Sequence, residues 1–265
     1  MKLLLTKMKT QMGTEIDYFF ECPEKDIHLN TFIGKQISLK WNGRIECSKC
    51  LKQTDKSFGQ GFCYSCFISA PEASPCILHP ELCEAHLGKG RDIEYELKYH
   101  NQPHIVYLAA TDIVKVGVTK ISQVPTRWID QGANKAIILA EVPNRYLAGK
   151  IEVALKDHFS DKTNWQSMLC NLQDETINLE NEKWRIHEIL PSDLTCYWSE
   201  DDSIHTFNYP VEIYPTKVAS LTFDKTPEIN GMLKGIKGQY LFFEDGQVLN
   251  IRRHTSYQIE FDEIS

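Results

Sequence analysis

The 265-residue sequence has no apolar run that approaches the ~18 residues of a membrane-spanning helix. Its opening segment, residues 1–11, carries three leucines between lysines, which is too short an apolar run for a secretory signal. Both absences favour a cytoplasmic protein without a membrane partner. The sequence also lacks an excess of positive charge, since its formal net charge is −7. This charge balance excludes a protein that binds nucleic acid with its whole surface.

The composition is that of a folded chain. Hydrophobic residues make up 42% of the sequence and charged residues 25%, which excludes collagen-like and disordered chains. The length corresponds to one or two domains, or to about three small ones. Residues 101–150 combine a positive net charge, from six Lys and Arg against three Asp and Glu, with many strand-forming residues.

Cysteines are unevenly placed, because six of the nine lie between Cys47 and Cys83. In a chain without an export signal, such a cluster indicates metal binding rather than disulfides. The first four form two Cys-x2-Cys pairs twelve residues apart: Cys47, Cys50, Cys63 and Cys66. Each pair lets one tight turn present two thiolates to a tetrahedral ion, and Gly59 and Gly61 lie where the chain must double back. We predict a closed structural zinc site in a treble-clef or ribbon-like module.

A second cluster follows, with the spacing Cys76-x2-His79-x3-Cys83-x2-His86. Two thiolates and two imidazoles can complete a tetrahedral zinc site. The alternatives are a partial site, or histidines that cap a helix around residues 81–86. Neither cluster leaves an open coordination position, so the sequence predicts one or two structural zinc ions that stabilise a segment short of core residues.

From residue 104 the pattern predicts a β-hairpin, with strands 104–110 and 114–118 around a turn at 111–113. A short helix at 126–133, a buried strand at 136–142 and a helix at 144–159 with Asn144 as its N-cap follow. Helical spacing places Glu152 at the margin of the apolar stripe of the last helix. A carboxylate at this position could bind a metal ion at the edge of a cleft. The alternative is an ordinary surface glutamate.

These elements carry a Tyr on the first strand, a Gly on the second, an Arg on the first helix and a Glu on the second. Their order resembles the GIY-YIG nuclease domain, in its phage-type branch. The first motif corresponds to residues 106–108 (VYL), and the second to residues 115–117 (KVG). The sequence departs from the family pattern at Ile105, which replaces the leading glycine, and at Lys115, where many members have tyrosine and the phage-type branch has lysine. The resemblance covers about residues 103–160.

The resemblance implies a metal-dependent endonuclease. It implies that Glu152 holds one Mg²⁺ or Mn²⁺. Tyr107, or Lys115 if its pKa is lowered, would help to deprotonate the attacking water, and Arg127 would bind the scissile phosphate. Substrate contacts would fall on Gly117, where the strand has no side chain, and on Thr119. Ordinary structural roles for each residue remain the alternative.

The two ends of the chain are also rich in strand-forming residues. Residues 18–45, with a turn at Asn42-Gly43, and the region from residue 211, with a turn at Asp245-Gly246, have all-β patterns. We therefore predict an α+β fold in which the ends meet in one small β-barrel or sandwich. The predicted domains are 1–45, 46–100, 101–204 and 205–265. Arg252 and Arg253 would bind a phosphate backbone or serve solubility.

Three strings, at 126–133 (TRWIDQGA), 161–165 (DKTNW) and 235–241 (GIKGQYL), are similar to those of an uncharacterised bacterial family. In that family a four-cysteine zinc segment precedes a GIY-YIG-like core, and no reaction is assigned. Two hypotheses follow. The protein is a nucleic-acid phosphodiesterase or endonuclease, acting on DNA rather than RNA, or it is a non-catalytic, zinc-stabilised nucleic-acid-binding or assembly protein. A cleft that opens Tyr107, Arg127 and Glu152 to solvent would favour the enzyme.

Overall fold

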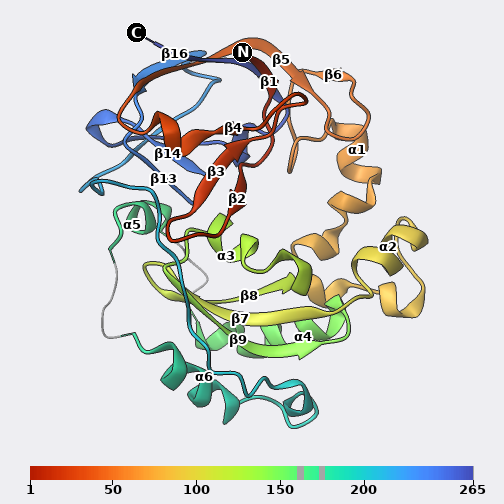
Figure 1. Ribbon diagram of the computed structural model, residues 1–265. Helices are drawn as coiled ribbons and strands as arrows, with labels where there is room; N and C mark the ends of the chain where they lie inside the picture. Colours follow the sequence, from red (N-terminus) through yellow and green to blue (C-terminus); the bar gives the residue numbers. More distant parts are fainter. Residues whose placement is uncertain (160–163, 173–176, 265) are drawn as a thin grey trace. The chain divides into compact units, whose positions relative to one another are not determined.

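The computed structural model describes residues 1–159, 164–172 and 177–264 (Figure 1). The chain separates into two units: residues 1–68 with 208–265, and residues 69–207. Each unit combines small sheets with short helices, as the α+β prediction requires. Within the described residues, every helix is too short or too polar to cross a membrane.

The main sheet of the first unit joins the two ends of the chain. It is antiparallel, in the order β1-β16-β5-β12, with β6 paired to β5. The strands are β1 (Lys2–Leu4), β5 (Gln36–Glu46), β6 (Gln53–Thr54), β12 (Glu228–Met232) and β16 (Tyr257–Glu263). The predicted pairing of the two chain ends is confirmed, but of the two predicted forms, barrel or sandwich, the barrel is wrong for the described strands, because this sheet is open and ends at β1 and β12.

Two smaller sheets complete the first unit. One contains β11 (Ala219–Leu221), β15 (Gln247–Asn250), β14 (Tyr240–Phe242) and β13 (Gly235–Lys237), and the other contains β2 (Lys9–Gln11), β3 (Asp17–Phe20) and β4 (Ile27–His28). The predicted Asp245-Gly246 turn joins β14 to β15, with φ of 55° and 70° at the two residues. The predicted turn at Asn42-Gly43 is wrong, because β5 continues through it as a bulge, with a shift of register against β16.

The second unit contains the predicted hairpin, helix, strand and helix. Its sheet has the order β10-β9-β7-β8, formed by β7 (His104–Ala110), β8 (Val114–Lys120), β9 (Lys135–Val142) and β10 (His205–Thr206). The two helices are α3 (Thr126–Asp130) and α4 (Arg145–Leu155), both shorter than predicted. Gly132, with φ of 71°, follows α3, and the chain after α4 tightens into a 3₁₀ turn. The side chain of Asn144 caps α4 by accepting a hydrogen bond from the amide of Leu147 at 3.0 Å.

One apolar cluster holds the second unit together. Strand β7 is buried along its whole length, between β8 and β9 (Figure 1). The apolar stripe of α4, formed by Ala148, Ile151 and Leu155, packs in this cluster together with α6 (Leu179–His187). Helix α5 (Trp165–Leu169) is capped by Asn164, whereas residues 161–163 of the DKTNW string lie outside the described residues.

The remaining helices are short. They are α1 (Tyr64–Ser69), α2 (Ile93–Tyr99) and the 3₁₀ turns Leu29–Phe32, Pro71–Ala73, Pro75–Ile77, Pro80–Leu82, Ala85–Leu87, Ile121–Gln123, Lys156–His158, Thr195–Tyr197, Glu244–Gly246 and Arg252–His254. Four of these turns lie between residues 71 and 87, so this segment has little regular structure of its own.

Candidate functional site

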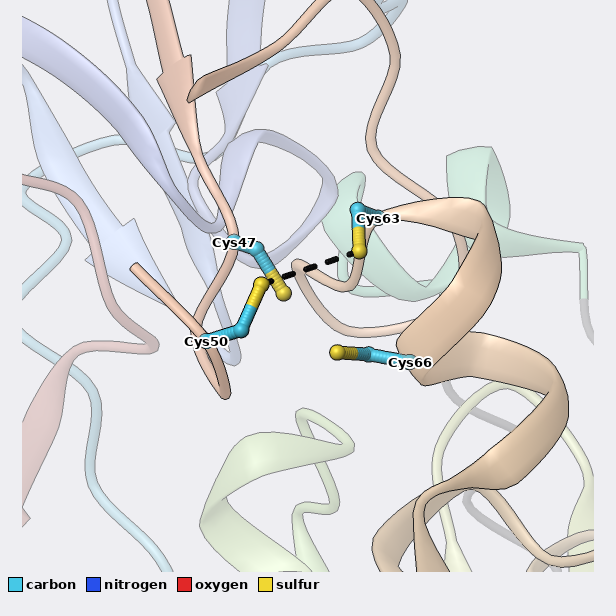
Figure 2. Close-up of side chains that lie close together, drawn as sticks. All are labelled: Cys47, Cys50, Cys63 and Cys66. Carbon is cyan, nitrogen blue, oxygen red and sulfur yellow. Dashed lines mark hydrogen bonds between the residues drawn. The ribbon is translucent and has the colours of Figure 1, made fainter. Parts of the chain in front are cut away.

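The four cysteines of the first predicted site come together in the first unit. Cys47 follows β5, Cys50 lies in the next turn, Cys63 precedes α1 and Cys66 lies within it. Their sulfur atoms all lie within 4.8 Å of one another and point toward a common centre (Figure 2). The Sγ atoms of Cys50 and Cys63 are 3.8 Å apart. Four thiolates around a tetrahedral zinc ion, with Zn–S bonds of ~2.3 Å, are separated by about this distance. The geometry therefore fits a metal ion.

Backbone contacts hold the two cysteine pairs in place. The carbonyl oxygen of Gly61 accepts hydrogen bonds from the amide of Ser48, at 2.8 Å, and from the hydroxyl of Ser256, at 3.1 Å. Gly61 has φ of 98°, and a Cβ there would lie 2.4 Å from Oγ of Ser256, so only glycine fits this turn. Burial opposes ionisation of Cys47, but hydrogen bonds from backbone amides, including that of Cys50, lower the pKa of its thiol to about 6. Such a thiol readily becomes the thiolate that a metal requires.

The second predicted cluster is arranged differently. Cys76 and Cys83 do lie together, but their neighbours are Glu96 and His100. The side chain of His79 is 61% exposed, and its Nδ1 lies 3.4 Å from Oε1 of Glu81. The ring of His86 stacks on Tyr146, with the centroids 4.5 Å apart. His100, rather than the predicted His79 or His86, is therefore the histidine that lies beside Cys76 and Cys83.

A pocket of about 340 Å³ opens on the second unit. Its polar lining includes Lys115 from β8, Glu152 from α4 and Gln131, which follows α3. The other lining residues are Leu78, His79, Glu81, Val116, Val153, Lys156 and Phe159. Two of the four predicted catalytic side chains, Lys115 and Glu152, thus reach one solvent-open pocket from different elements.

The other two predicted catalytic residues, Tyr107 and the half-buried Arg127, do not line this pocket. Tyr107 is 1% exposed, and its hydroxyl donates a hydrogen bond to Oε1 of Gln131 at 2.8 Å. Burial raises the pKa of the Tyr107 phenol, against the opposing effect of the guanidinium of Arg127, while the charge of Glu152 raises it further. The guanidinium of Arg127 and the carboxylate of Glu152 are therefore both within electrostatic reach of the Tyr107 phenol. Gln131, which sequence reasoning missed, links Tyr107 to the pocket.

A family model described as a protein of unknown function (DUF2797) matches residues 34–259. The chain belongs to this family. The match covers most of both units, and it includes the four-cysteine cluster and the pocket, so the expectation of an uncharacterised family is confirmed. Comparison with curated proteins and with solved structures gives no match.

In this DUF2797 protein the predicted substrate-binding residues belong to both units. Gly117 lies opposite Tyr107 in the sheet, and a Cβ at Gly117 would lie 2.6 Å from Cζ of the tyrosine. The glycine therefore makes room for the phenol. Thr119 is only 6% exposed. Arg252 and Arg253 lie in a 3₁₀ turn of the other unit, where Arg253 is exposed.

Close packing against α4 brings the segment around His79 and Glu81 to the pocket. Gly149, in the middle of α4, is buried, and a Cβ there would lie 2.1 Å from the backbone nitrogen of Glu81 and 2.4 Å from the carbonyl carbon of Pro80. The 3₁₀ turn Pro80–Leu82 therefore rests directly on the helix backbone. This DUF2797 chain thus builds one wall of its pocket from Leu78, His79 and Glu81, of which the sequence had predicted a role only for His79, as a zinc ligand or helix cap.

Proposed function

We propose that this DUF2797 protein is a nucleic-acid phosphodiesterase, an endonuclease of the GIY-YIG type that uses one Mg²⁺ or Mn²⁺ ion. One observation carries the proposal: an acidic side chain, Glu152, and a basic one, Lys115, line the same open pocket. They do so on a core whose strands and helices follow the order of the nuclease domain that the sequence resembles.

Phosphodiester hydrolysis requires an activated water, a cation for the scissile phosphate and stabilisation of the leaving oxygen. The Glu152 carboxylate suits a hard divalent cation that keeps several water ligands. Arg127 supplies a permanent planar cation for a phosphate group, and it acts on the same Tyr107 phenol that is bonded to Gln131 of the pocket wall.

Between the two predicted bases, the pocket favours Lys115. Tyr107 is buried, its hydroxyl is already bonded to Gln131, and its raised pKa disfavours ionisation. Lys115 lines the pocket directly. Lys115 can accept a proton only as the neutral amine, a form that a divalent cation bound at Glu152 would favour. We assign the proton-accepting role to Lys115 in that neutral form, and to Tyr107 the role of a positioning residue that holds Gln131.

The four-cysteine cluster has a structural role in this proposal. Four thiolates leave zinc without an open coordination position, so the ion would stabilise the fold around residues 47–66 and would take no part in hydrolysis. DNA is the proposed substrate, and the basic side chains of residues 101–150 are the proposed contacts with its phosphates.

The test is a cleavage assay with single-stranded, duplex and branched DNA and with RNA, in the presence of Mg²⁺ or Mn²⁺. Glu152→Gln is compared with Glu141→Gln, which makes the same change at an exposed position of β9. Losing metal-based stabilisation of ~3 kcal/mol would slow cleavage about 100-fold in Glu152→Gln. Glu141→Gln should cleave like the unaltered protein.

Three other outcomes would count against parts of the proposal. Metal-dependent cleavage that survives Glu152→Gln would show that the site is wrongly assigned. Equal losses in both variants would point to general charge rather than to the pocket. Nucleic-acid binding without cleavage would favour a non-catalytic binding protein, the alternative that the burial of Tyr107 supports.

A further inference from the structure

The segment from residue 75 to residue 88 is held in place with very little apolar core. Its buried cluster consists of Cys76, Cys83 and Ala85, with Tyr146 packed against it. Its large apolar side chains point outward instead, with Leu78 at 83%, Leu82 at 58% and Leu87 at 59% exposure. Hydrophobic burial alone therefore does not explain why this segment has a defined position.

Four buried side chains with metal-binding atoms meet beneath this segment. Cys76, Cys83, Glu96 and His100 are 7%, 2%, 3% and 2% exposed, and one ligand atom of each lies within 4.8 Å of the others. Sγ of Cys76 is 3.6 Å from Nδ1 of His100, and the same nitrogen contacts Oε2 of Glu96. Two sulfurs, one imidazole nitrogen and one carboxylate oxygen are a donor set that zinc accepts in tetrahedral sites.

Without a cation, this arrangement would be costly. A buried carboxylate loses its hydration, two buried thiols beside it cannot both ionise, and a single imidazolium would offset only one negative charge. Two thiolates and one carboxylate carry three negative charges, of which a divalent ion would balance two. The guanidinium of Arg145 lies within electrostatic reach of both cysteines and donates hydrogen bonds to the carbonyl oxygens of Cys76 (2.8 Å) and Ile77 (3.0 Å). One divalent ion with Arg145 would therefore bring the cluster close to neutrality.

Neighbouring residues orient the carboxylate. The hydroxyl of Ser74 donates a hydrogen bond to Oε1 of Glu96 at 3.3 Å, and Oε2 contacts the imidazole of His100. A Cβ at residue 90 would lie 2.3 Å from Cγ of Glu96. Gly90 therefore leaves the space that the Glu96 side chain occupies. Supporting contacts of this kind are typical of metal ligands.

We infer that Cys76, Cys83, Glu96 and His100 bind a second zinc ion, in place of the set with His79 and His86 that the sequence predicted. The ion ties the segment before α2 to the end of that helix. The end of α2 is in turn linked to the start of α4, because the amide of Arg145 donates a hydrogen bond of 2.9 Å to the carbonyl oxygen of His100. This inference stands whether or not the pocket cleaves nucleic acid.

The first test counts zinc in the purified full-length chain by mass spectrometry of its metals. The unaltered protein should hold two zinc ions per chain. His100→Ala should retain one, whereas the matched change His86→Ala should retain two. One zinc ion in the unaltered protein, or two in His100→Ala together with one in His86→Ala, would overturn the inference.

A second test needs no variant, and so it is independent of whether His100→Ala folds. Anomalous diffraction at the zinc absorption edge from crystals of the unaltered protein should show one peak among Cys47, Cys50, Cys63 and Cys66. A second peak should lie ~2.3 Å from the sulfurs of Cys76 and Cys83 and within bonding distance of His100. A second peak bonded to His79 or His86, or none at these cysteines, would contradict the inference. Crystals of Glu152→Gln should show both peaks, so zinc binding can be judged separately from the proposed nuclease activity.

Discussion

The change Gly149→Ala separates two opposing effects on α4. In an ordinary helix interior, alanine in place of glycine raises stability by about 1 kcal/mol through helix propensity. Here the added Cβ would lie 2.1 Å from the backbone nitrogen of Glu81 and 2.4 Å from the carbonyl carbon of Pro80. These are backbone atoms, so either the 3₁₀ turn or the helix must move. Overpacking typically costs ~1–3 kcal/mol, and contacts this short place the cost at the upper end of that range.

We therefore expect Gly149→Ala to lower the free energy of unfolding by about 1–2 kcal/mol, with a fall in Tm of ~2–8 °C. Urea and thermal unfolding of the full-length chain, followed by tryptophan fluorescence, would measure both quantities. Lys150→Ala, at the exposed neighbouring position, is the control and should change stability by less than ~0.5 kcal/mol. A rise in stability for Gly149→Ala would refute the reasoning, because it would show that the turn Pro80–Leu82 does not rest on the helix.

Three further predictions concern other parts of the chain. Gly117→Ala should lower stability by ~1–3 kcal/mol in urea unfolding, because its Cβ would meet the buried ring of Tyr107; an unchanged unfolding midpoint would contradict this packing. Burial lowers the pKa of His104 from 6.5 to about 4, so the unfolded state takes up its proton first as the pH falls. Stability should therefore be lost below pH 6.5, by about 2 kcal/mol between pH 7 and pH 5, and His104→Leu should remove this part of the pH dependence. Cys63→Ser should lose one bound metal ion and destabilise the protein, whereas Cys196→Ser, an exposed cysteine outside both clusters, should keep its metal content and its Tm.

Local signals account for what the sequence predicted well. The β7–β8 hairpin consists of two runs of strand-forming residues separated by a short turn, and Asn144 has the short polar side chain that caps a helix. Both the hairpin and the helix start can therefore be recognised without knowledge of distant contacts. The Cys-x2-Cys spacing likewise fixes two ligands within one turn. These elements appear in the structure at or close to the predicted residues.

Long-range packing accounts for what the sequence did not indicate. Glu96 and His100 are distant from Cys76 and Cys83 in sequence, and only their i, i+4 spacing on one helix face hinted that they act together. Asn42-Gly43 has the composition of a hairpin turn, but pairing with β16 on one side keeps β5 extended through it. The role of Gly117 required the register that places it opposite Tyr107.

The order of the two units along the chain has a consequence for synthesis on the ribosome. Leu3 pairs with Ile259 and Leu39 with Phe261, so the first strands of the chain emerge long before their partners are made. Residues 69–207 form a unit from one continuous segment and can fold while the rest is still being translated. The first unit can be completed only at the end, because it must close a loop that contains the whole of the second. Until then its early strands have unpaired edges. At this stage of synthesis the chain would be prone to aggregation and open to binding by a chaperone.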